Sequence, residues 1–324
     1  MEIIDIEGTI SEITSCLIHN ASNFKTLWFR GQPDFQHQLL PSIFRQGNIF
    51  KVEFNEHGMF EEFKRRYPEQ SSNHTTTYEW LTLMQHYGLP TRLLDWSSNL
   101  LVALYFCCAN DIDKDGGLYA FDPTFMERDF QFNEFLEMQI QEKSRSDFFN
   151  RIIYKMDTVL DEDSKLNGIS IGRLRSNLYE RVKFTGLSAG SSKDFESLTI
   201  KQELPSTKDM NGNIVPYVEQ DIKRAFSNIV PFKAPHLNSR TRLQHGFFTF
   251  HGGMYIDGKE FIPVENMEQH TYSEKSLLKI RIKAKDKISF LKELEYVGIR
   301  EATLFPEMEY QAREIKHQFS IKKS

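Results

Sequence analysis

Hydrophobic and polar residues alternate in several short segments of the chain, which is the pattern of half-buried β-strands. Other short runs are rich in β-branched and aromatic residues, which also favours strands. Together these runs predict strands at residues 26–29, 118–121, 229–232, 246–250, 278–282 and 303–305. Arg30 follows the first of these runs, so we expect it to lie where a strand leaves the sheet.

Hydrophobic residues spaced three and four apart predict amphipathic helices. The pattern is present at residues 55–66 and 288–296, and a last helix is expected to begin at Pro306. Residues 100–109 are apolar on nearly every helical face, so this helix is expected to be buried. Ser98 or Asp95 is in position to cap it.

One helix has sequence signals at both of its ends. Thr76 and Glu79 form a capping-box pattern, in which each side chain accepts from a free backbone donor. Gly88 accepts a left-handed conformation and Pro90 cannot continue a helix, so the helix should end near residue 88. Helices interspersed with strands predict a mixed α/β or α+β fold.

The chain contains no internal repeat and no linker rich in Pro, Gly or Ser. Residues 1–324 are therefore expected to form a single domain. Between residues 123 and 226 the pattern changes to charge-rich helical segments and polar stretches. We interpret this part as a helical insertion or lid on the core fold.

Composition narrows the class of protein. Of the 324 residues, 40% are hydrophobic and 26% are charged, which is typical of a globular protein. Three cysteines provide no disulfide framework, and the N-terminal residues lack the pattern of a secretory signal, so a cytoplasmic location is expected. No apolar run is long enough to span a bilayer, so no membrane partner is expected. The net charge of −5 argues against a surface that binds nucleic acid throughout.

Polar and aromatic side chains are concentrated between residues 85 and 96, in a segment that we expect to be a helix-turn-helix junction. Groups that can donate, accept, carry charge or stack are Gln85, His86, Tyr87, Thr91, Arg92, Asp95 and Trp96. Arg92 and Asp95 are close enough to pair, either as ligand-binding groups or as a buried structural ion pair. Trp96 offers a flat face for a ring or a cation.

Arg30 is a second candidate. A lone arginine is most often an exposed surface residue, but Phe29 before it and Gly31 after it indicate a close backbone approach at this point. A planar guanidinium in such a position favours ligand binding, in particular of phosphate or carboxylate groups.

Several motifs resemble those of the FRG-domain family, named for its Phe-Arg-Gly triplet. They are Trp-Phe-Arg-Gly at 28–31, Leu-Pro-Ser-Ile-Phe-Arg at 40–45, residues 85–96, Arg-Leu-Gln-His-Gly-Phe at 242–247 and Leu-Phe-Pro-Glu at 304–307. The resemblance spans about residues 26 to 315, with residues 123–226 unmatched. The segment 88–96, Gly-Leu-Pro-Thr-Arg-Leu-Leu-Asp-Trp, is its most specific part.

The order of these motifs is similar to the three-motif layout of ADP-ribosyltransferases. This second resemblance implies a mixed sheet core flanked by helices, NAD as the cofactor and mono-ADP-ribosyl transfer as the activity. Cleavage of the nicotinamide bond of NAD builds positive charge on the ribose, so a nearby acceptor group lowers the barrier.

The resemblance also assigns roles to residues. Arg30 would hold the pyrophosphate or ribose, Thr91, Arg92 and Asp95 would brace the second wall, and Gln244 would face the ribose. Gln244 can bond a ribose hydroxyl but carries no negative charge, so Asp95, Glu301 or Glu307 would have to supply the carboxylate. Residues expected to contact the cofactor are Arg30, Gly31, Gln85, His86, Tyr87, Trp96 and His245. His245 is also a candidate acid or base, or a structural residue.

The function that this resemblance implies is that of a toxin or phage-defence effector which modifies a protein, RNA or DNA, with an antitoxin protein as a further partner. The alternative is a nucleotide-binding or sensing module without catalysis. No metal is predicted, because the acidic turn at 111–122 lacks the bidentate Glu of a calcium loop and is followed by strand residues.

Overall fold

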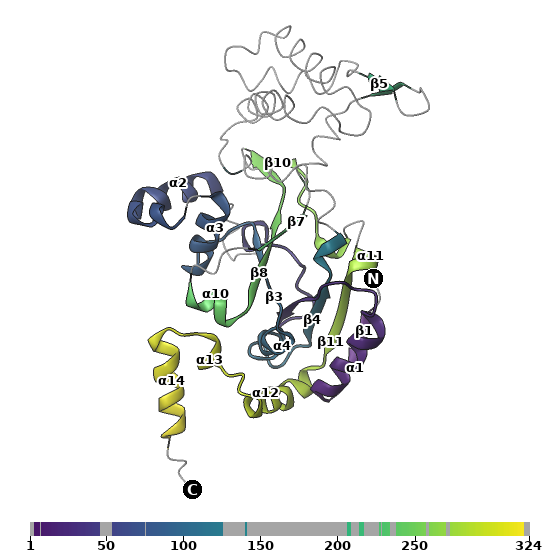
Figure 1. The fold of residues 1–324 in the computed structure, drawn as a ribbon, viewed down its shortest axis with the longest axis vertical. Coiled ribbons are helices and arrows are strands. Elements are labelled where there is room, and N and C mark those ends of the chain that lie inside the picture. Colours follow the sequence, from purple (N-terminus) through teal and green to yellow (C-terminus); the bar gives the residue numbers. More distant parts are fainter. Residues whose placement is uncertain are drawn as a thin grey trace.

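The computed structural model describes residues 3–6, 8–45, 54–74, 76–125, 140, 206–208, 214–216, 227, 229–233, 238–256, 259–269 and 273–320. These residues form a mixed α/β fold, as the sequence predicted (Figure 1). Most of the predicted insertion at 123–226 lies outside the described residues. The insertion and the single-domain organisation therefore stay predictions.

The core of the described part is a seven-stranded mixed sheet. β1 pairs with β11 in parallel, and the other neighbouring strands pair antiparallel. In spatial order the strands are β1 (Ile3–Ile6), β11 (Leu277–Ile282), β4 (Gly116–Phe121), β2 (Trp28–Gln32), β3 (Leu93–Ser97), β8 (Gly246–His251) and β7 (Ile229–Phe232). Two hairpins stand apart from this sheet, β9 (Met254–Ile256) with β10 (Lys259–Ile262) and β5 (Ser206–Lys208) with β6 (Ile214–Pro216).

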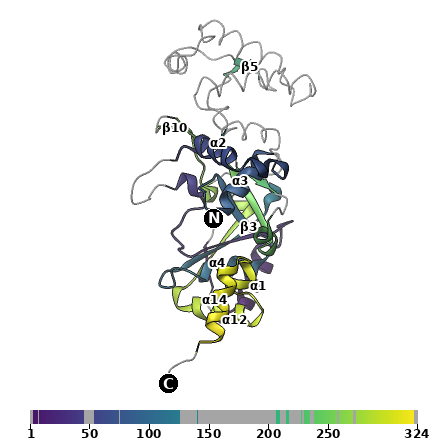
Figure 2. The same cartoon turned by 90° about the vertical axis from the view of Figure 1, so that its left-hand side faces the viewer.

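Two groups of helices pack on the sheet, each through its own hydrophobic cluster. The first group covers β1, β11, β4 and β2 and consists of α1 (Ile10–Asn20), α4 (Leu100–Cys108) and α12 (Lys287–Tyr296). The second group packs on β3, β8 and β7 and consists of α2 (Glu56–Arg66) and α3 (Thr77–His86). Two views at right angles place α2 and α3 toward one end of the described body and α12 toward the other (Figures 1 and 2).

The remaining helices are short or peripheral. They are α10 (Ser239–Leu243), α11 (Ser273–Ser276), α13 (Glu301–Leu304) and α14 (Met308–Gln318), with single 3-10 turns at Ser42–Phe44, Pro68–Ser72, Pro123–Phe125, Met267–Gln269 and Ala284–Asp286. A third hydrophobic cluster contains Trp28, Trp96, Tyr119 and Phe121. Alternation along β2, β3 and β4 directs these side chains away from the face that carries Phe29 and Leu93.

At the centre of the sheet, β2 and β3 share little backbone pairing. These two strands pair only at Phe29 and Ser97, whereas β2 pairs with β4 along its whole length. Beyond Phe29 and Ser97, β2 and β3 therefore no longer bond to each other through their backbones. This divergence lies between the two helix groups and gives side chains of both strands access to the space between α3 and α4.

The predicted start and end of α3 are confirmed. The hydroxyl of Thr76 accepts from the backbone N–H of Glu79, and the Glu79 carboxylate accepts from the N–H of Thr76 at 2.8 Å. Gly88 has φ = +85°, a conformation that favours glycine, directly after the helix. Local side-chain bonds determine the start of the helix, and the left-handed conformation of Gly88 determines its end.

Three predictions of secondary structure were wrong. The segment 85–96 is a helix, a turn and a strand, because residues 93–97 pair with β8. The N-cap of α4 is Asn99, whose side chain accepts from Leu101 N at 2.9 Å, and neither Ser98 nor Asp95 has this role. Residues 301–304 are helical, although 303–305 was expected to be a strand.

Candidate functional site

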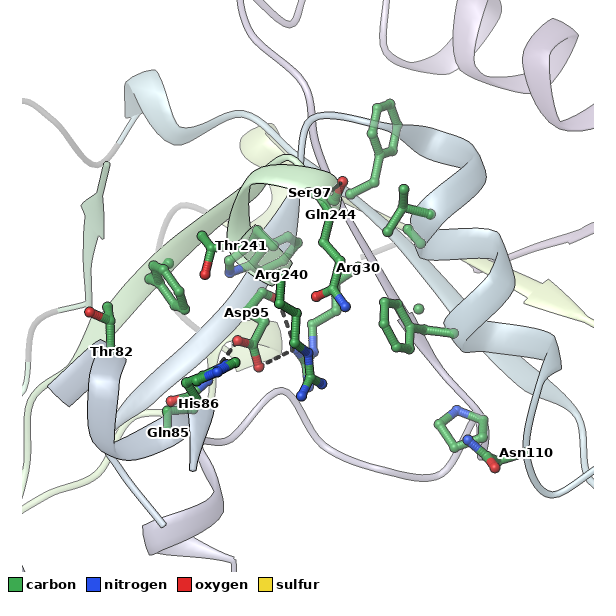
Figure 3. Close-up of a pocket in the computed structure, with 18 residues that line it drawn as sticks. Arg30, Thr82, Gln85, His86, Asp95, Ser97, Asn110, Arg240, Thr241 and Gln244 are labelled. Carbon is green, nitrogen blue, oxygen red and sulfur yellow. Dashed lines mark hydrogen bonds and ion pairs between the residues drawn. The ribbon is translucent and has the colours of Figure 1, made fainter. Parts of the chain in front are cut away.

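A cavity of about 310 Å³ lies between the two helix groups, over the divergence of β2 and β3. Residues of β2, β3, α3, α4 and α10 line it. Gln85, His86, Asp95, Arg30 and Arg240 are grouped on one side of the cavity, and Asn110 lies on the other side (Figure 3). Val102, Ala103 and Phe106 of α4 add an apolar wall.

Asp95 is the carboxylate of this cavity. Its neighbours Leu94 and Trp96 are buried, and Asp95, between them on β3, has a side chain that is 63% exposed. Oδ1 accepts from the Gln85 side-chain nitrogen at 2.6 Å, and Oδ2 lies 3.8 Å from Arg30 Nη1. The carboxylate is thus oriented by the protein but open to a ligand.

Arg30 lies within β2 and not at its end, which corrects the predicted position. Its Nη1 donates to the main-chain oxygen of Asp95 at 2.7 Å, so the side chain spans the divergence between β2 and β3. Burial lowers the pKa of Arg30 to about 10, and the nearby Asp95 only partly opposes this. Nε of Arg30 is buried without an acceptor among the described residues.

Gly31 allows β2 and α4 to touch. A Cβ at this position would overlap the carbonyl oxygen of Ala103 and lie 2.5 Å from the backbone nitrogen of Cys107. Any other residue would therefore force the helix away from the strand. The triplet Phe29-Arg30-Gly31 thus combines a core residue, a largely buried cation and a close helix contact on one strand.

Gln85 has a defined amide orientation. The Thr91 hydroxyl donates to its side-chain oxygen and in turn accepts from Leu93 N at 3.3 Å. The Gln85 nitrogen therefore faces Asp95. Thr91 is fully buried and does not line the cavity, so it positions Gln85 and through it the carboxylate.

His86 lines the cavity at the C-terminal end of α3. Burial lowers the pKa of its imidazole, and the positive charge of Arg240 lowers it further, while Glu307 acts in the opposite direction. Burial and the charge of Arg240 therefore favour the neutral form of His86. A neutral imidazole can accept a proton or a hydrogen bond.

Gln244 lines the cavity, as predicted, and is fixed at two points. Its main-chain oxygen accepts from the Ser97 hydroxyl at 2.7 Å, and its side-chain nitrogen donates to Leu304 O at 3.2 Å. The bond to Leu304 thus fixes the orientation of the Gln244 amide. His245 does not line the cavity; it has φ = +50°, and its carbonyl accepts from Ser98 N at 3.1 Å.

Arg92 does not line the cavity. The predicted pairing of Arg92 with Asp95 is wrong. Arg92 pairs with Glu56, its Nε lying 2.9 Å from the carboxylate, and its Nη1 donates to the carbonyls of His251 and Gly253. Only 3% of its side chain is exposed. Arg92 therefore anchors α2 to the end of β8.

Two aromatic residues of the segment lie differently from what was expected. The ring of Trp96 is buried in the core, where it donates from Nε1 to Thr249 at 3.0 Å and packs on Phe121, so it offers no open stacking face. Tyr87 is 70% exposed and contacts the ring of His86 from outside the cavity.

Of the three residues expected to supply a carboxylate to the site, only one lies in the cavity. Asp95 lines the cavity, and Glu301 and Glu307 do not. Glu301 is engaged by Arg313, whose Nη1 lies 2.6 Å from it. Glu307 acts on His86 only through its charge.

The most important residue that the sequence reasoning missed is Arg240. It lines the cavity with Thr241, from helix α10 just before the motif at 242–247. The only local signal is that Asn238 caps this helix, accepting from Thr241 N at 2.7 Å. Other residues that were missed are Pro33, Thr82, Ser97, Phe106 and Asn110.

A buried lysine supports the cavity wall from behind. Lys287 of α12 is fully buried, and its ammonium donates to the carbonyls of Pro33, Asn110 and Asp111 at 2.6, 3.2 and 3.0 Å. Pro33 and Asn110 both line the cavity. Lys287 thus joins the end of β2 to the end of α4.

Within the described ranges, no helix is both long and apolar enough to cross a membrane. No curated protein and no solved structure matches the chain. Residues 25–116, which contain Arg30, Gly31, Gln85 and Asp95, match the family model of the FRG domain. This match supports, over residues 25–116, the resemblance to the FRG-domain family that the motifs indicated.

Proposed function

We propose that the cavity binds NAD and that the protein is an NAD-dependent mono-ADP-ribosyltransferase-like enzyme. The observation that carries this proposal is the meeting of a largely buried arginine, Arg30, and an oriented, open carboxylate, Asp95, in one cavity. The cavity volume of about 310 Å³ is in the range of small-molecule sites, at its lower end.

The residues present fit such a ligand. Arg30 has a buried Nε donor without an acceptor among the described residues, which suits a phosphate oxygen. The oxygen of Gln244 suits a ribose hydroxyl. The apolar wall of α4, with Phe106, suits a planar ring.

Each residue then has a distinct role. NAD supplies an electrophilic ribose carbon when it is bound. Asp95 would stabilise positive charge on that ribose, because an oriented carboxylate acts strongly on charge that develops beside it. Arg30 would hold the phosphates. Neutral His86 would accept a proton from the acceptor group.

The enzyme hypothesis is tested by incubating the purified protein with NAD and cellular lysate and following the products by mass spectrometry. Release of nicotinamide, with or without labelled protein, RNA or DNA, is expected. Asp95→Asn should lower turnover about 100-fold or more, which is the scale of one electrostatic group. Asp113→Asn, at an exposed position outside the cavity, is the matched control. Equal NAD consumption by Asp95→Asn and wild type would remove Asp95 from the mechanism.

A second candidate is a nucleotide-binding or sensing module without turnover. Two observations favour it: residue 244 is an uncharged glutamine, and Asp95 is already bonded by Gln85. Thermal shift separates the two candidates, because a ligand stabilises the protein whether or not it reacts. A shift with NAD and no nicotinamide release would identify a sensor.

We also propose that the protein acts in the cytoplasm as a toxin or phage-defence effector, with an antitoxin protein as a partner. The support is the resemblance to ADP-ribosyltransferases alone. Expression should then arrest growth, and Arg30→Ala should relieve the arrest. Equal toxicity of Arg30→Ala at equal protein level would contradict this.

A further inference from the structure

Arg240 has a stacked and defined position in the wall of the cavity. Its guanidinium carbon lies 4.5 Å from the centre of the Phe305 ring, which is buried. Stacking uses the flat face of a guanidinium and leaves the N–H donors at its edge for another partner. Figure 3 places Arg240 near His86 and Asp95, on the polar side of the cavity.

Arg240 differs from other arginines of the region in lacking a counter-ion. Arg300 pairs with Glu314 at 3.0 Å, and Arg313 pairs with Glu301 at 2.6 Å. Within the part of the chain that the structure describes, the side chain of Arg240 forms no ion pair and no hydrogen bond, and only its main-chain oxygen accepts a bond, from Gln244 N. Its donors are therefore available to an anion from outside the protein.

The charges around the cavity add to a positive site in an acidic protein. Arg30 and Arg240 line it, and Arg45 is close enough to act on Arg30 electrostatically. Asp95 is the opposing charge, and Gln85 already bonds one of its oxygens. Two arginines and one carboxylate thus line the cavity, and Arg45 and Glu307 act on its residues through their charges from outside it, while the whole chain carries a net charge of −5.

We propose that Arg240 and Arg30 together bind a diphosphate, so that the cavity selects nucleoside diphosphates and dinucleotides over the matching monophosphates. This inference rests on the proposed nucleotide-binding role of the cavity, but it does not require catalysis. Two arginines from separate elements, α10 and β2, can each engage one phosphate, and a monophosphate can engage only one of them.

The test compares ADP with AMP, which share base and sugar, by isothermal titration calorimetry on the full chain. Wild type should bind ADP at least about tenfold more tightly than AMP, the scale of one added charge-assisted hydrogen bond. Arg240→Gln should weaken ADP binding about tenfold or more and bring the ADP to AMP ratio close to one. Arg242→Gln removes the same charge from the same helix at an exposed position outside the cavity, and should leave the ratio unchanged.

Several outcomes would overturn the inference. These are a wild-type ratio near one, an Arg240→Gln ratio equal to wild type, an equal loss in Arg242→Gln, or no binding of ADP, ADP-ribose or NAD. The proposed enzymatic function fails separately: ADP selectivity that depends on Arg240, without any NAD turnover, removes catalysis and keeps the diphosphate site. If NAD is turned over but the ratio of ADP to AMP affinity does not depend on Arg240, the enzymatic function stands and the diphosphate site is removed.

Discussion

The side-chain nitrogen of Gln85 lies 2.6 Å from Oδ1 of Asp95, and the hydroxyl of Thr91 fixes the orientation of that amide. A helix end, a turn and a strand thus cooperate to aim one carboxylate into the cavity. Because the carboxylate is 63% exposed, the bond serves orientation more than burial.

Removal of the Thr91 hydroxyl should therefore affect ligand binding as well as stability. Thr91→Val keeps the shape of the side chain but leaves the Gln85 oxygen without its donor. We expect a loss of about 1–2 kcal/mol in unfolding free energy and a several-fold weaker affinity for NAD or ADP. Denaturant melts and calorimetry measure the two effects.

The control for this variant is Thr249→Val, at another fully buried threonine whose hydroxyl bonds Trp96 in the core. It should lose comparable stability and keep ligand affinity. An unchanged affinity in Thr91→Val would show that Gln85 needs no second partner.

The charge of Arg30 is expected to lower the stability of the folded protein, as is common for a residue that serves binding. Its pKa is lowered to about 10, below the ordinary value, because burial penalises the charged guanidinium. This charge therefore reduces the stability of the folded state below pH 10, and the penalty is relieved as pH rises through 10. Arg30→Gln should leave stability at pH 7 unchanged or raise it by about 1–2 kcal/mol, while abolishing anion binding. A large stability loss in urea melts would instead make Arg30 a structural residue.

His86 and Arg240 should be coupled in titration. His86 has a lowered pKa because of burial and the charge of Arg240, so Arg240→Gln should raise that pKa and Arg242→Gln should not. NMR titration of the imidazole measures this. The unfolded state binds the proton more readily, so the contribution of His86 to stability is present above its ordinary pKa and is lost as pH falls below it. An identical His86 pKa in both variants would contradict the arrangement.

The pair formed by Arg92 and Glu56 should behave as a structural element. Glu56→Gln leaves a buried guanidinium without its charge partner and should cost about 3–5 kcal/mol. The double variant Arg92→Met with Glu56→Met should recover much of that loss and keep nucleotide affinity. A folded double variant that had lost nucleotide affinity would show that Arg92 takes part in binding.

Gly31→Ala should destabilise the protein strongly, because its Cβ would overlap the backbone of α4. We expect a loss of about 3 kcal/mol or more. Gly58→Ala, where the Cβ meets only the side chain of Asn55, should be neutral or slightly stabilising, since alanine favours a helix. Equal melting temperatures for the two variants would be inconsistent with this packing.

These residues also indicate how far the sequence could predict the structure. The capping box at Thr76 and the left-handed Gly88 were predictable because the chemistry is local. The strand at residues 93–97 was not, because a short apolar run has no distinctive period and pairing with β8 decides its conformation. At residues 301–304 the run favoured a strand, but the Thr303 hydroxyl accepts from Arg300 N at 2.9 Å and helps to begin a helix.

The sequence motifs identified many of the residues that line the cavity, but not how their side chains are arranged. Seven of the predicted residues line the cavity: Arg30, Gly31, Gln85, His86, Asp95, Trp96 and Gln244. Asp95 lies on β3 and Arg92 directly precedes that strand, and in extended backbone residues three apart point to opposite faces, which the expected helix could not reveal. Arg240 reaches the cavity only through the pairing of β8 with β3, a contact between segments about 150 positions apart that no local pattern encodes.

The ammonium of Lys287, held by three carbonyl oxygens, occupies the kind of oxygen-lined position that a bound potassium or sodium ion fills elsewhere. Because this cation is covalently part of the chain, it cannot dissociate or be exchanged. The placement of Pro33 and Asn110 should therefore be the same whichever monovalent salt surrounds the protein, and dialysis should not loosen it.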